Sequence, residues 1–439
     1  MLNENNGLWR MAIFSAAAMV MMSVSGAASG YTEKTLYSFC SVKKCHDGSQ
    51  PFGGLVMDRA GNLYGTTLHG GPYAVGGSLG DGVVYEFAPA TGQYTTIYNF
   101  CSLTICADGK DPSEVKLIID TNGNLYGTTT EGGNSSVGLG VVFELERTQA
   151  GWVEEVLHAF CPNLSKNCKD AGVPNSGLTY AGASTGQPYD GTSALFGTTS
   201  LGGTHDQGAV YVLMPKQKGA KWSEKVLYSF CSLANCADGE QPQDAPYLDE
   251  AGNLYGTTEL GGQFNPQGGT VFELSPNGEK YTETTLYSFC AQTNCTDGKE
   301  PYSGMIMDGA GNLIGTASNG GGRGRGLIFE LSPNGSRWRY NTRVDFNGKN
   351  GSYPASDLML DLNGNVFGTA SGGGTNGKGG AVFEFNGAVQ TIYSFCAVRK
   401  CLDGKIPFAG VIEDNAGNFY GATSAGGSRD RGTIYELSP

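Results

Sequence analysis

The sequence predicts an all-β fold, a seven-bladed β-propeller with four antiparallel strands in each blade. Three observations support this: a GNLYGTT-like motif recurs seven times in 439 residues, a strand-like run such as GTVFEL follows each copy, and an aromatic run ending in phenylalanine precedes the next. Repeats built from short strands and turns are typical of propeller blades. The 70 glycines recur at fixed places in the repeat, which argues for ordered turns and against disorder.

The first repeat shows where the strands are expected. Residues 54–58 and 62–67 form the first two strands, and the turn between them contains Gly61. Polar and apolar residues partly alternate in both runs, as in half-buried strands. Glycine adopts positive φ without strain, which favours a tight hairpin here.

The third and fourth strands of this repeat are expected at residues 82–87 and 94–100. Equivalent links in later repeats contain Pro-Asn-Gly, whose proline and glycine favour turns. A phenylalanine ends every expected fourth strand. These are Phe39, Phe100, Phe160, Phe230, Phe289, Phe346 and Phe395.

The two ends of the repeat array are out of phase. Residues 31–39 form a fourth strand without the first three, and residues 432–437 form a third strand without a fourth. If the first segment completes the last blade, the ring closes and a free sheet edge disappears. We therefore expect one domain over residues 31–439, closed by its N-terminal strand. The alternative, an open β-solenoid, leaves an incomplete repeat at each end.

The N-terminus has the pattern of a secretory signal peptide over residues 1–28. Arg10 precedes an apolar run over residues 11–24, and small residues follow at 25–28. The run is short for a membrane span. We expect a cleaved signal, a secreted or periplasmic protein, and no membrane attachment after cleavage; a retained anchor helix is the alternative.

Twelve cysteines form six close pairs, each just after an aromatic run. The pairs are Cys40/Cys45, Cys101/Cys106, Cys161/Cys168, Cys231/Cys236, Cys290/Cys295 and Cys396/Cys401. The sixth repeat lacks both partners, and this joint absence favours disulfides in an oxidising compartment. Metal binding is the alternative, but four residues intervene in five pairs and six in the other, unlike CxxC sites.

The net charge of −13 argues against nucleic acid and anionic membranes as partners. The chain contains no nucleophile elbow, HExxH motif or phosphate-binding loop. We therefore predict no catalytic residue, metal site or cofactor, and favour a binding protein over an enzyme.

The consensus DGxxPxxGLxxDxxGNLYGTTxxGGxxxxGTVFELSP resembles the GloVer repeat of exported bacterial proteins, over residues 31–439. The resemblance implies an exported, propeller-like array. Members of that family carry differing C-terminal anchors after the array. This chain ends at its last expected strand, which argues against cell-wall attachment.

In a propeller the Gly-Gly loops and the cysteine loops share one face, which we call the loop face. Each cysteine loop leads through an aspartate into an innermost strand, so these carboxylates are candidate ligands for a cation or sugar hydroxyls at the channel mouth. They are Asp47, Asp108, Asp238, Asp297 and Asp403. The alternative is an Asx-type turn in which each carboxylate caps its own backbone.

Blade 1 has the longest Gly-Gly loop, and its candidate binding residues are His46, His69, Tyr73 and Asp81. Because a single ligand requires differences between blades, we expect it to bind on this face near the channel mouth. The sequence predicts an extracellular binding or interaction module for a carbohydrate or protein ligand. The alternative is a polysaccharide hydrolase or lyase with its site on the same face.

Overall fold

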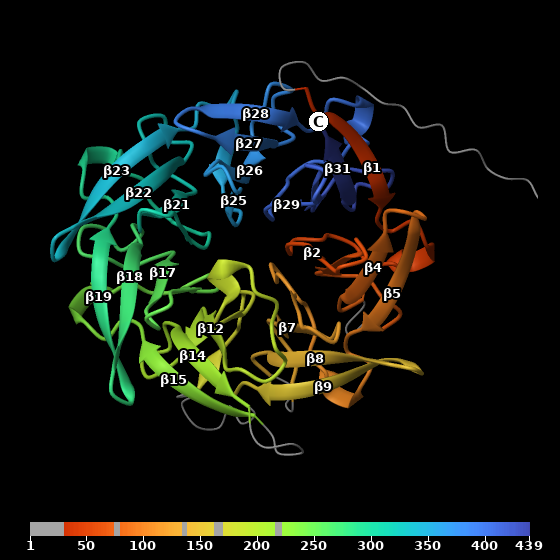
Figure 1. Cartoon of the computed structure of the whole chain (residues 1–439), viewed down its shortest axis with the longest axis horizontal. Coiled ribbons are helices and arrows are strands. Elements are labelled where there is room, and N and C mark those ends of the chain that lie inside the picture. Colours follow the sequence, from red (N-terminus) through yellow and green to blue (C-terminus); the bar gives the residue numbers. More distant parts are fainter. Residues whose placement is uncertain (1–29, 74–79, 134–137, 162–169, 216–221) are drawn as a thin grey trace, which may run out of the picture.

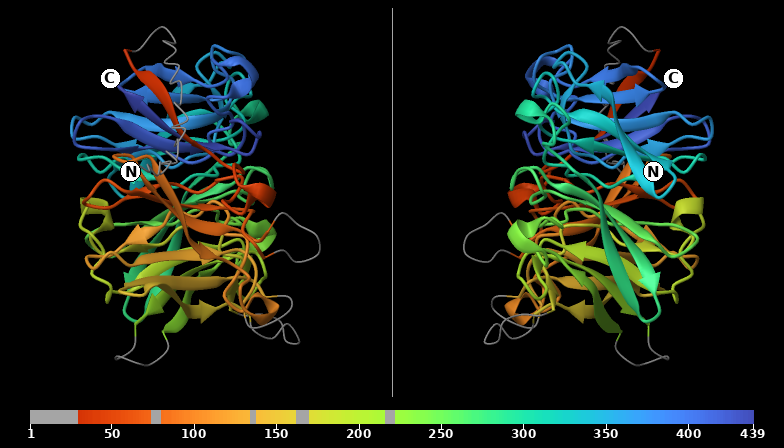
Figure 2. Two further views of the ribbon diagram at one scale, coloured as in Figure 1. Left: turned by 90° about the vertical axis from the view of Figure 1, so that its right-hand side faces the viewer. Right: turned by 90° about the vertical axis from the view of Figure 1, so that its left-hand side faces the viewer.

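The computed structural model describes residues 30–73, 80–133, 138–161, 170–215 and 222–439. Seven sheets surround a central axis (Figure 1), and the side views show their strands running between two faces of the ring (Figure 2). The predicted seven-bladed β-propeller is therefore confirmed. The proposed signal peptide lies outside the described residues. Within these ranges, no helix is long and apolar enough to cross a membrane.

Each blade contains one antiparallel four-strand path, numbered from the axis outward. Blade 1 comprises β2 (Val56–Met57), β3 (Leu63–Thr67), β4 (Val83–Ala88) and β5 (Gln93–Asn99). Blade 2 comprises β6 (Ile118–Ile119), β7 (Leu125–Thr129), β8 (Val141–Thr148) and β9 (Gly151–Ala159). Blade 3 comprises β11 (Thr179–Tyr180), β12 (Leu195–Thr199), β14 (Ala209–Met214) and β15 (Ser223–Ser229). Blade 4 comprises β16 (Tyr247–Leu248), β17 (Leu254–Thr258), β18 (Thr270–Asn277) and β19 (Lys280–Ser288).

Blade 5 comprises β20 (Ile306–Met307), β21 (Leu313–Ala317), β22 (Leu327–Asn334) and β23 (Arg337–Asp345). Blade 6 comprises β25 (Met359–Leu360), β26 (Val366–Gly372), β27 (Ala381–Phe385) and β28 (Val389–Ser394), with β24 (Ser352–Pro354) also paired to β26. Blade 7 comprises β29 (Ile412–Glu413), β30 (Phe419–Thr423), β31 (Thr433–Ser438) and β1 (Thr32–Ser38). A short pair, β10 (Ala171–Gly172) with β13 (Leu201–Gly202), lies beside blade 3. The innermost strands have only two residues, fewer than the sequence predicts.

The predicted ring closure is confirmed. Strand β1 pairs antiparallel with β31, from Thr32 opposite Ser438 to Ser38 opposite Thr433. Figure 1 shows the red first strand beside the dark blue last strand. The edge of β31 is therefore covered by a strand from the other end of the domain.

The phenylalanine that ends each fourth strand forms the contact between blades. Its ring packs against an aromatic side chain in the third strand of the next blade, with centroids 4.9 to 5.2 Å apart. The seven pairs are Phe39–Tyr85, Phe100–Phe143, Phe160–Tyr211, Phe230–Phe272, Phe289–Phe329, Phe346–Phe383 and Phe395–Tyr435. Such pairs stabilise by about 0.5–1.5 kcal/mol beyond the apolar area that they bury.

A second contact between blades joins a glycine to a proline. The glycine before each third strand has positive φ, and a Cβ there would lie 2.5 to 2.9 Å from Cδ of the proline in the next blade. The pairs are Gly432–Pro51, Gly82–Pro112, Gly140–Pro174, Gly208–Pro242, Gly269–Pro301, Gly326–Pro354 and Gly380–Pro407. Close packing of neighbouring blades thus accounts for the recurrence of both residues in the motif.

Five of the six predicted disulfides are present, each with a Cα–Cα distance of 4.0 Å. They join Cys40–Cys45, Cys101–Cys106, Cys231–Cys236, Cys290–Cys295 and Cys396–Cys401. Cys168, the predicted partner of Cys161, lies outside the described residues. Multiple disulfides indicate an oxidising, extracytoplasmic compartment.

The cysteine loops lie against the Gly-Gly loops of their own blades. In blade 1 the amide of Gly71 donates to the carbonyl of Cys45 at 3.0 Å, and in blade 4 Gly262 donates to Cys236 at 2.9 Å. The two kinds of loop therefore share one face, as the predicted strand order requires.

Candidate functional site

The aspartates of the cysteine loops are buried and hydrogen-bonded within their own loops. Asp47, for example, accepts from the amides of Ser41 at 2.8 Å and Val42 at 3.1 Å, and from the hydroxyl of Tyr37 at 2.7 Å. Asp108, Asp238, Asp297 and Asp403 repeat this arrangement with Tyr98, Tyr228, Tyr287 and Tyr393. Their oxygens cap the backbone in the manner of the Asx-turn alternative.

The candidate residues of blade 1 occupy different environments on the loop face. His46 and Tyr73 are exposed, whereas Asp81 is buried. The carbonyl of Asp81 accepts from the amide of Asp111, and Nδ1 of His69 lies 3.6 Å from the Asp111 carboxylate. The neighbouring Asp111 carboxylate raises the pKa of His69. The structure thus brings His69 and Asp81 together around Asp111, a blade 2 residue that the sequence analysis did not select.

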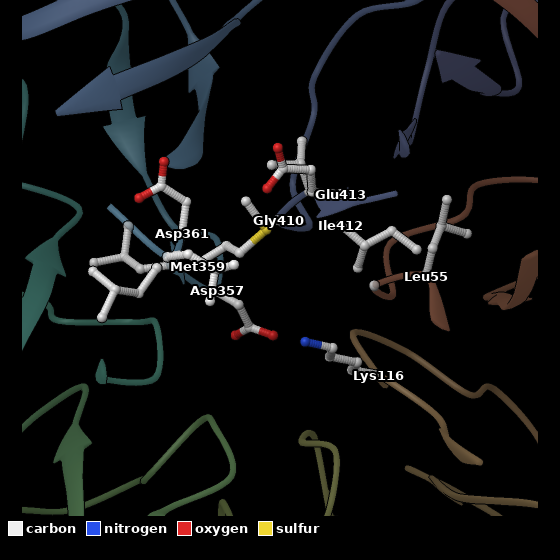
Figure 3. A pocket seen from close by; sticks show the side chains of 13 residues that line it. Leu55, Lys116, Asp357, Met359, Asp361, Gly410, Ile412 and Glu413 are labelled. Atoms are coloured by element: carbon white, nitrogen blue, oxygen red, sulfur yellow. The ribbon is translucent and has the colours of Figure 1, made fainter. Parts of the chain in front are cut away.

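A larger candidate site lies in the central channel. It is a cavity of about 370 Å³ lined by the innermost segments of blades 1, 2, 6 and 7 (Figure 3). Its rim includes Asp361, Leu362 and Glu413, which lie at the hairpins between innermost and second strands. The cavity therefore extends to the face opposite the loop face.

The hairpins at this rim are held by aspartates that precede their Gly-Asn turns. Asp361 accepts from the amides of Asn363 at 2.9 Å and Asn365 at 2.7 Å. Asp58, Asp120, Asp249, Asp308 and Asp414 accept from the equivalent asparagine amide in their own turns. These carboxylates stabilise hairpins, so Asp361 shapes the rim while its oxygens are engaged in the turn.

One position of the repeat places two opposite charges inside the channel. It is the third residue after the loop proline in most blades, and four blades have glycine there: Gly54, Gly177, Gly304 and Gly410. Space is narrow at this level, because a Cβ on Gly410 would lie 2.5 Å from the carbonyl oxygen of Asp357. Blade 4 has Ala245, whereas blades 2 and 6 have Lys116 and Asp357. The sevenfold repetition is therefore broken by one cation and one anion.

Lys116 and Asp357 extend toward one another across the pocket in Figure 3. The carboxyl of Asp357 is also within hydrogen-bonding reach of Asp244 in blade 4. Asp244 accepts from the amides of Gly304 and Ala245. Burial and the neighbouring Asp357 raise the pKa of Asp244 well above its usual value. Burial thus disfavours the charged form of the Asp244 carboxyl.

Aromatic rings narrow the channel on the side of the loop face. Phe408 packs edge-on against Phe52 at 5.6 Å and against Tyr302 at 5.7 Å between centroids. The hydroxyl of Tyr302 lies 3.4 Å from the carboxylate of Glu114, a blade 2 residue. Burial raises the pKa of Glu114 to about 7. A smaller cavity of about 30 Å³ among these rings adjoins the main pocket at Asp357.

The sequence analysis did not select Lys116, Asp244 or Asp357. Each is an ordinary charged residue in a short polar segment, and no catalytic motif surrounds it. The signal that identifies them is an alignment of the seven repeats at the innermost strands, where a charged side chain replaces a small residue just before the strand.

Fold and site define a class of protein: a disulfide-stabilised, seven-bladed β-propeller with a charged pocket in its channel. Within that class, the chain belongs to the family described as the Gloeobacter/Verrucomicrobia repeat, whose model matches residues 20–194 and 281–439. The resemblance seen in the repeat motif is thereby confirmed. No curated protein matches the chain.

Solved structures share the fold at low sequence identity. A fungal alcohol oxidase of the AA5 family in complex with copper is 13% identical with a TM-score of 0.51, and the match covers 89% of this chain and 75% of the oxidase. Polysaccharide lyase Uly1 is 11% identical with a TM-score of 0.49, covering 92% of both chains. A putative 6-phosphogluconolactonase from Bacteroides uniformis is 13% identical with a TM-score of 0.46, covering 83% of this chain and 92% of that one. At such identities the likeness concerns the fold alone.

Proposed function

We propose that this protein is an exported binding module that takes a carbohydrate into the channel pocket. The observation that carries the proposal is the replacement of a small residue by Lys116 and Asp357 at one repeated position. The repeat becomes asymmetric where the pocket lies, and a single ligand needs such asymmetry. The disulfides, and the signal expected from the sequence, support export.

The size and lining of the pocket favour a carbohydrate over a protein ligand. Its volume of about 370 Å³ lies within the range of roughly 300–1,000 Å³ that small-molecule sites occupy. Lys116 supplies hydrogen-bond donors and Asp357 supplies acceptors for hydroxyl groups. Leu358 and Met359 add apolar wall against which the C–H faces of a sugar pack.

The carboxyl pair supports binding and argues against glycoside hydrolysis at this site. The carboxyls of glycosidases stand about 5–9.5 Å apart, with the substrate and, in inverting enzymes, a water between them. Asp244 and Asp357 are within hydrogen-bonding reach of each other, and backbone amides occupy both oxygens of Asp244. Burial instead favours the uncharged form of Asp244, which reduces the negative charge beside a neutral ligand.

A glycan array probed with the mature protein, residues 31–439, tests the proposal. Each hit is then measured by calorimetry with the wild type and with Lys116→Ala and Asp357→Ala, since Ala245 shows that alanine fits this position. Loss of a charged hydrogen bond costs about 1.5–3 kcal/mol, so we expect affinity to fall roughly 10- to 100-fold in either variant.

His69→Gln is the matched control on the loop face and leaves affinity unchanged if the channel binds the ligand. Loss of binding in His69→Gln alone, with both alanine variants unaffected, would place the ligand on the loop face of blade 1. Release of product from any hit would show an enzyme instead of a binding module.

A further inference from the structure

A second cluster of polar groups lies away from the channel, where the outer strands of blades 2 and 3 meet. His158 comes from β9, Glu224 from β15, and Asp170 from the segment that leads into blade 3. One ligand atom from each residue lies within 4.8 Å of the other two. Nε2 of His158 is 3.5 Å from Oδ2 of Asp170. All three side chains are half-buried.

The other blades show what is unusual about this cluster. Five of them have tyrosine at the position of His158, and its hydroxyl donates to the loop aspartate at 2.7 to 2.9 Å. His158 does not reproduce that bond. Its Nε2 and the Oε1 of Glu224 are buried atoms without a hydrogen-bond partner among the described residues. Two buried polar atoms directed into one cluster require an explanation.

Glutamate at the position of Glu224 is not by itself unusual. Glu154 and Glu283 occupy the same register in blades 2 and 4, opposite Leu145 and Leu274 as Glu224 is opposite Leu213. Those glutamates lie near Asp108 and Asp238, whose partners are tyrosines. His158 of blade 2 is therefore the feature that distinguishes this cluster.

Two further departures occur in the same segment of the sequence. Asp170 is followed by Ala171 where five other blades have Asp-Gly, and six residues separate Cys161 from Cys168 where the other pairs have four between them. The carboxylates of Asp170 and Glu224 each bring an oxygen within 4.8 Å of the other. A bound cation would relieve the repulsion between these two carboxylates.

We propose that His158, Asp170 and Glu224 bind one zinc ion. Imidazole nitrogen and carboxylate oxygen are zinc ligands, with bonds of about 2.0–2.2 Å. In a tetrahedral site such bonds place neighbouring ligand atoms roughly 3.3–3.5 Å apart, which matches the 3.5 Å between Nε2 of His158 and Oδ2 of Asp170. The two carboxylates balance the ion's charge, and a water completes the tetrahedron. Tyrosine at this position would keep its proton near pH 7, so the other blades lack the third ligand.

The test uses the mature protein with its disulfides intact, first treated with a chelator and then titrated with Zn²⁺ by calorimetry. We expect one equivalent bound by the wild type and none at this site in His158→Tyr, which restores the residue found in five other blades. Glu224→Gln should weaken binding at least 10-fold. Glu283→Gln, the equivalent change in blade 4, should leave it unchanged.

Titration with Co²⁺ adds a spectroscopic measurement, because a tetrahedral site gives visible absorption that His158→Tyr should abolish. If His158→Tyr unfolds, His158→Gln replaces it in both titrations. Equal zinc stoichiometry and affinity in the wild type and the histidine variants would overturn the proposal. So would a folded wild type that binds no zinc, or equal losses in Glu224→Gln and Glu283→Gln.

Discussion

The ring of Phe39 packs against the ring of Tyr85 with their centroids 5.1 Å apart. Phe39 follows β1, whose backbone pairs with β31 in blade 7, whereas Tyr85 lies in β4 of blade 1. The N-terminal segment therefore completes the last blade through hydrogen bonds and joins it to the first through an aromatic contact. The two contacts together join the two ends of the ring.

Removing this segment should open the ring. Deletion of residues 31–39 exposes the edge of β31 and removes the contact with Tyr85, so we expect loss of cooperative thermal unfolding or aggregation. Phe39→Ala should lower the free energy of unfolding by about 3–5 kcal/mol, measured by denaturant titration. An unchanged melting curve for the deletion would show that the ring does not depend on β1.

Two glycine substitutions separate backbone strain from packing between blades. Gly61 and Gly269 have φ values of +84° and +83°, but only Gly269 has atoms within 4 Å of a built Cβ, including Cδ of Pro301 at 2.6 Å. Gly61→Ala should cost about 1–2 kcal/mol through left-handed φ alone. Gly269→Ala should cost clearly more, because the proline of the next blade must move. Equal losses in chemical denaturation would contradict the proposed packing role.

Stability should fall as the pH rises from 5 to 8.5. Burial raises the pKa of Glu33 to about 7, of Glu154 to about 8 and of Glu283 to about 7. The folded state holds these protons more tightly than the unfolded state, so their contribution is complete below about pH 4.5 and is lost as the pH passes through 7 to 8.

The raised pKa of His69 changes the stability of the fold in the same direction. The pKa of His69 is raised by Asp111, so its contribution is also present at low pH and lost at high pH. Denaturant titrations at pH 5, 7 and 8.5 measure how the free energy of unfolding depends on pH. Glu283→Gln should make this dependence weaker. Stability that increases steadily over this range would show that the buried glutamates do not control it.

Each disulfide should join cysteines within one loop. Peptide mapping without reductant is expected to recover the five bonds seen here and a sixth between Cys161 and Cys168. A loop of this length contributes roughly 2 kcal/mol through the entropy of the unfolded chain, so reduction should lower the melting temperature substantially. Bridges between different repeats would disprove the local pairing rule.

The strands, ring closure and cysteine pairing were predictable because each rests on a local pattern or on the phase of the repeat. The pocket was not. Lys116 and Asp357 come from blades 2 and 6, and only the curvature of the ring brings them together in one channel. The sequence indicated that Asp47 is either a ligand or a turn cap, and its burial in hydrogen bonds to Ser41 and Val42 could be seen only in three dimensions.

The short span of the disulfides has a consequence for biogenesis. Cysteines that bond lie five positions apart in each described pair, whereas Thr32 pairs with Ser438 at the other end of the domain. In each described pair the nearest thiol along the chain is the correct partner, so each loop can be oxidised before the ring closes. Correct pairing of these cysteines therefore does not depend on the long-range contact between β1 and β31, which brings together the two ends of the domain.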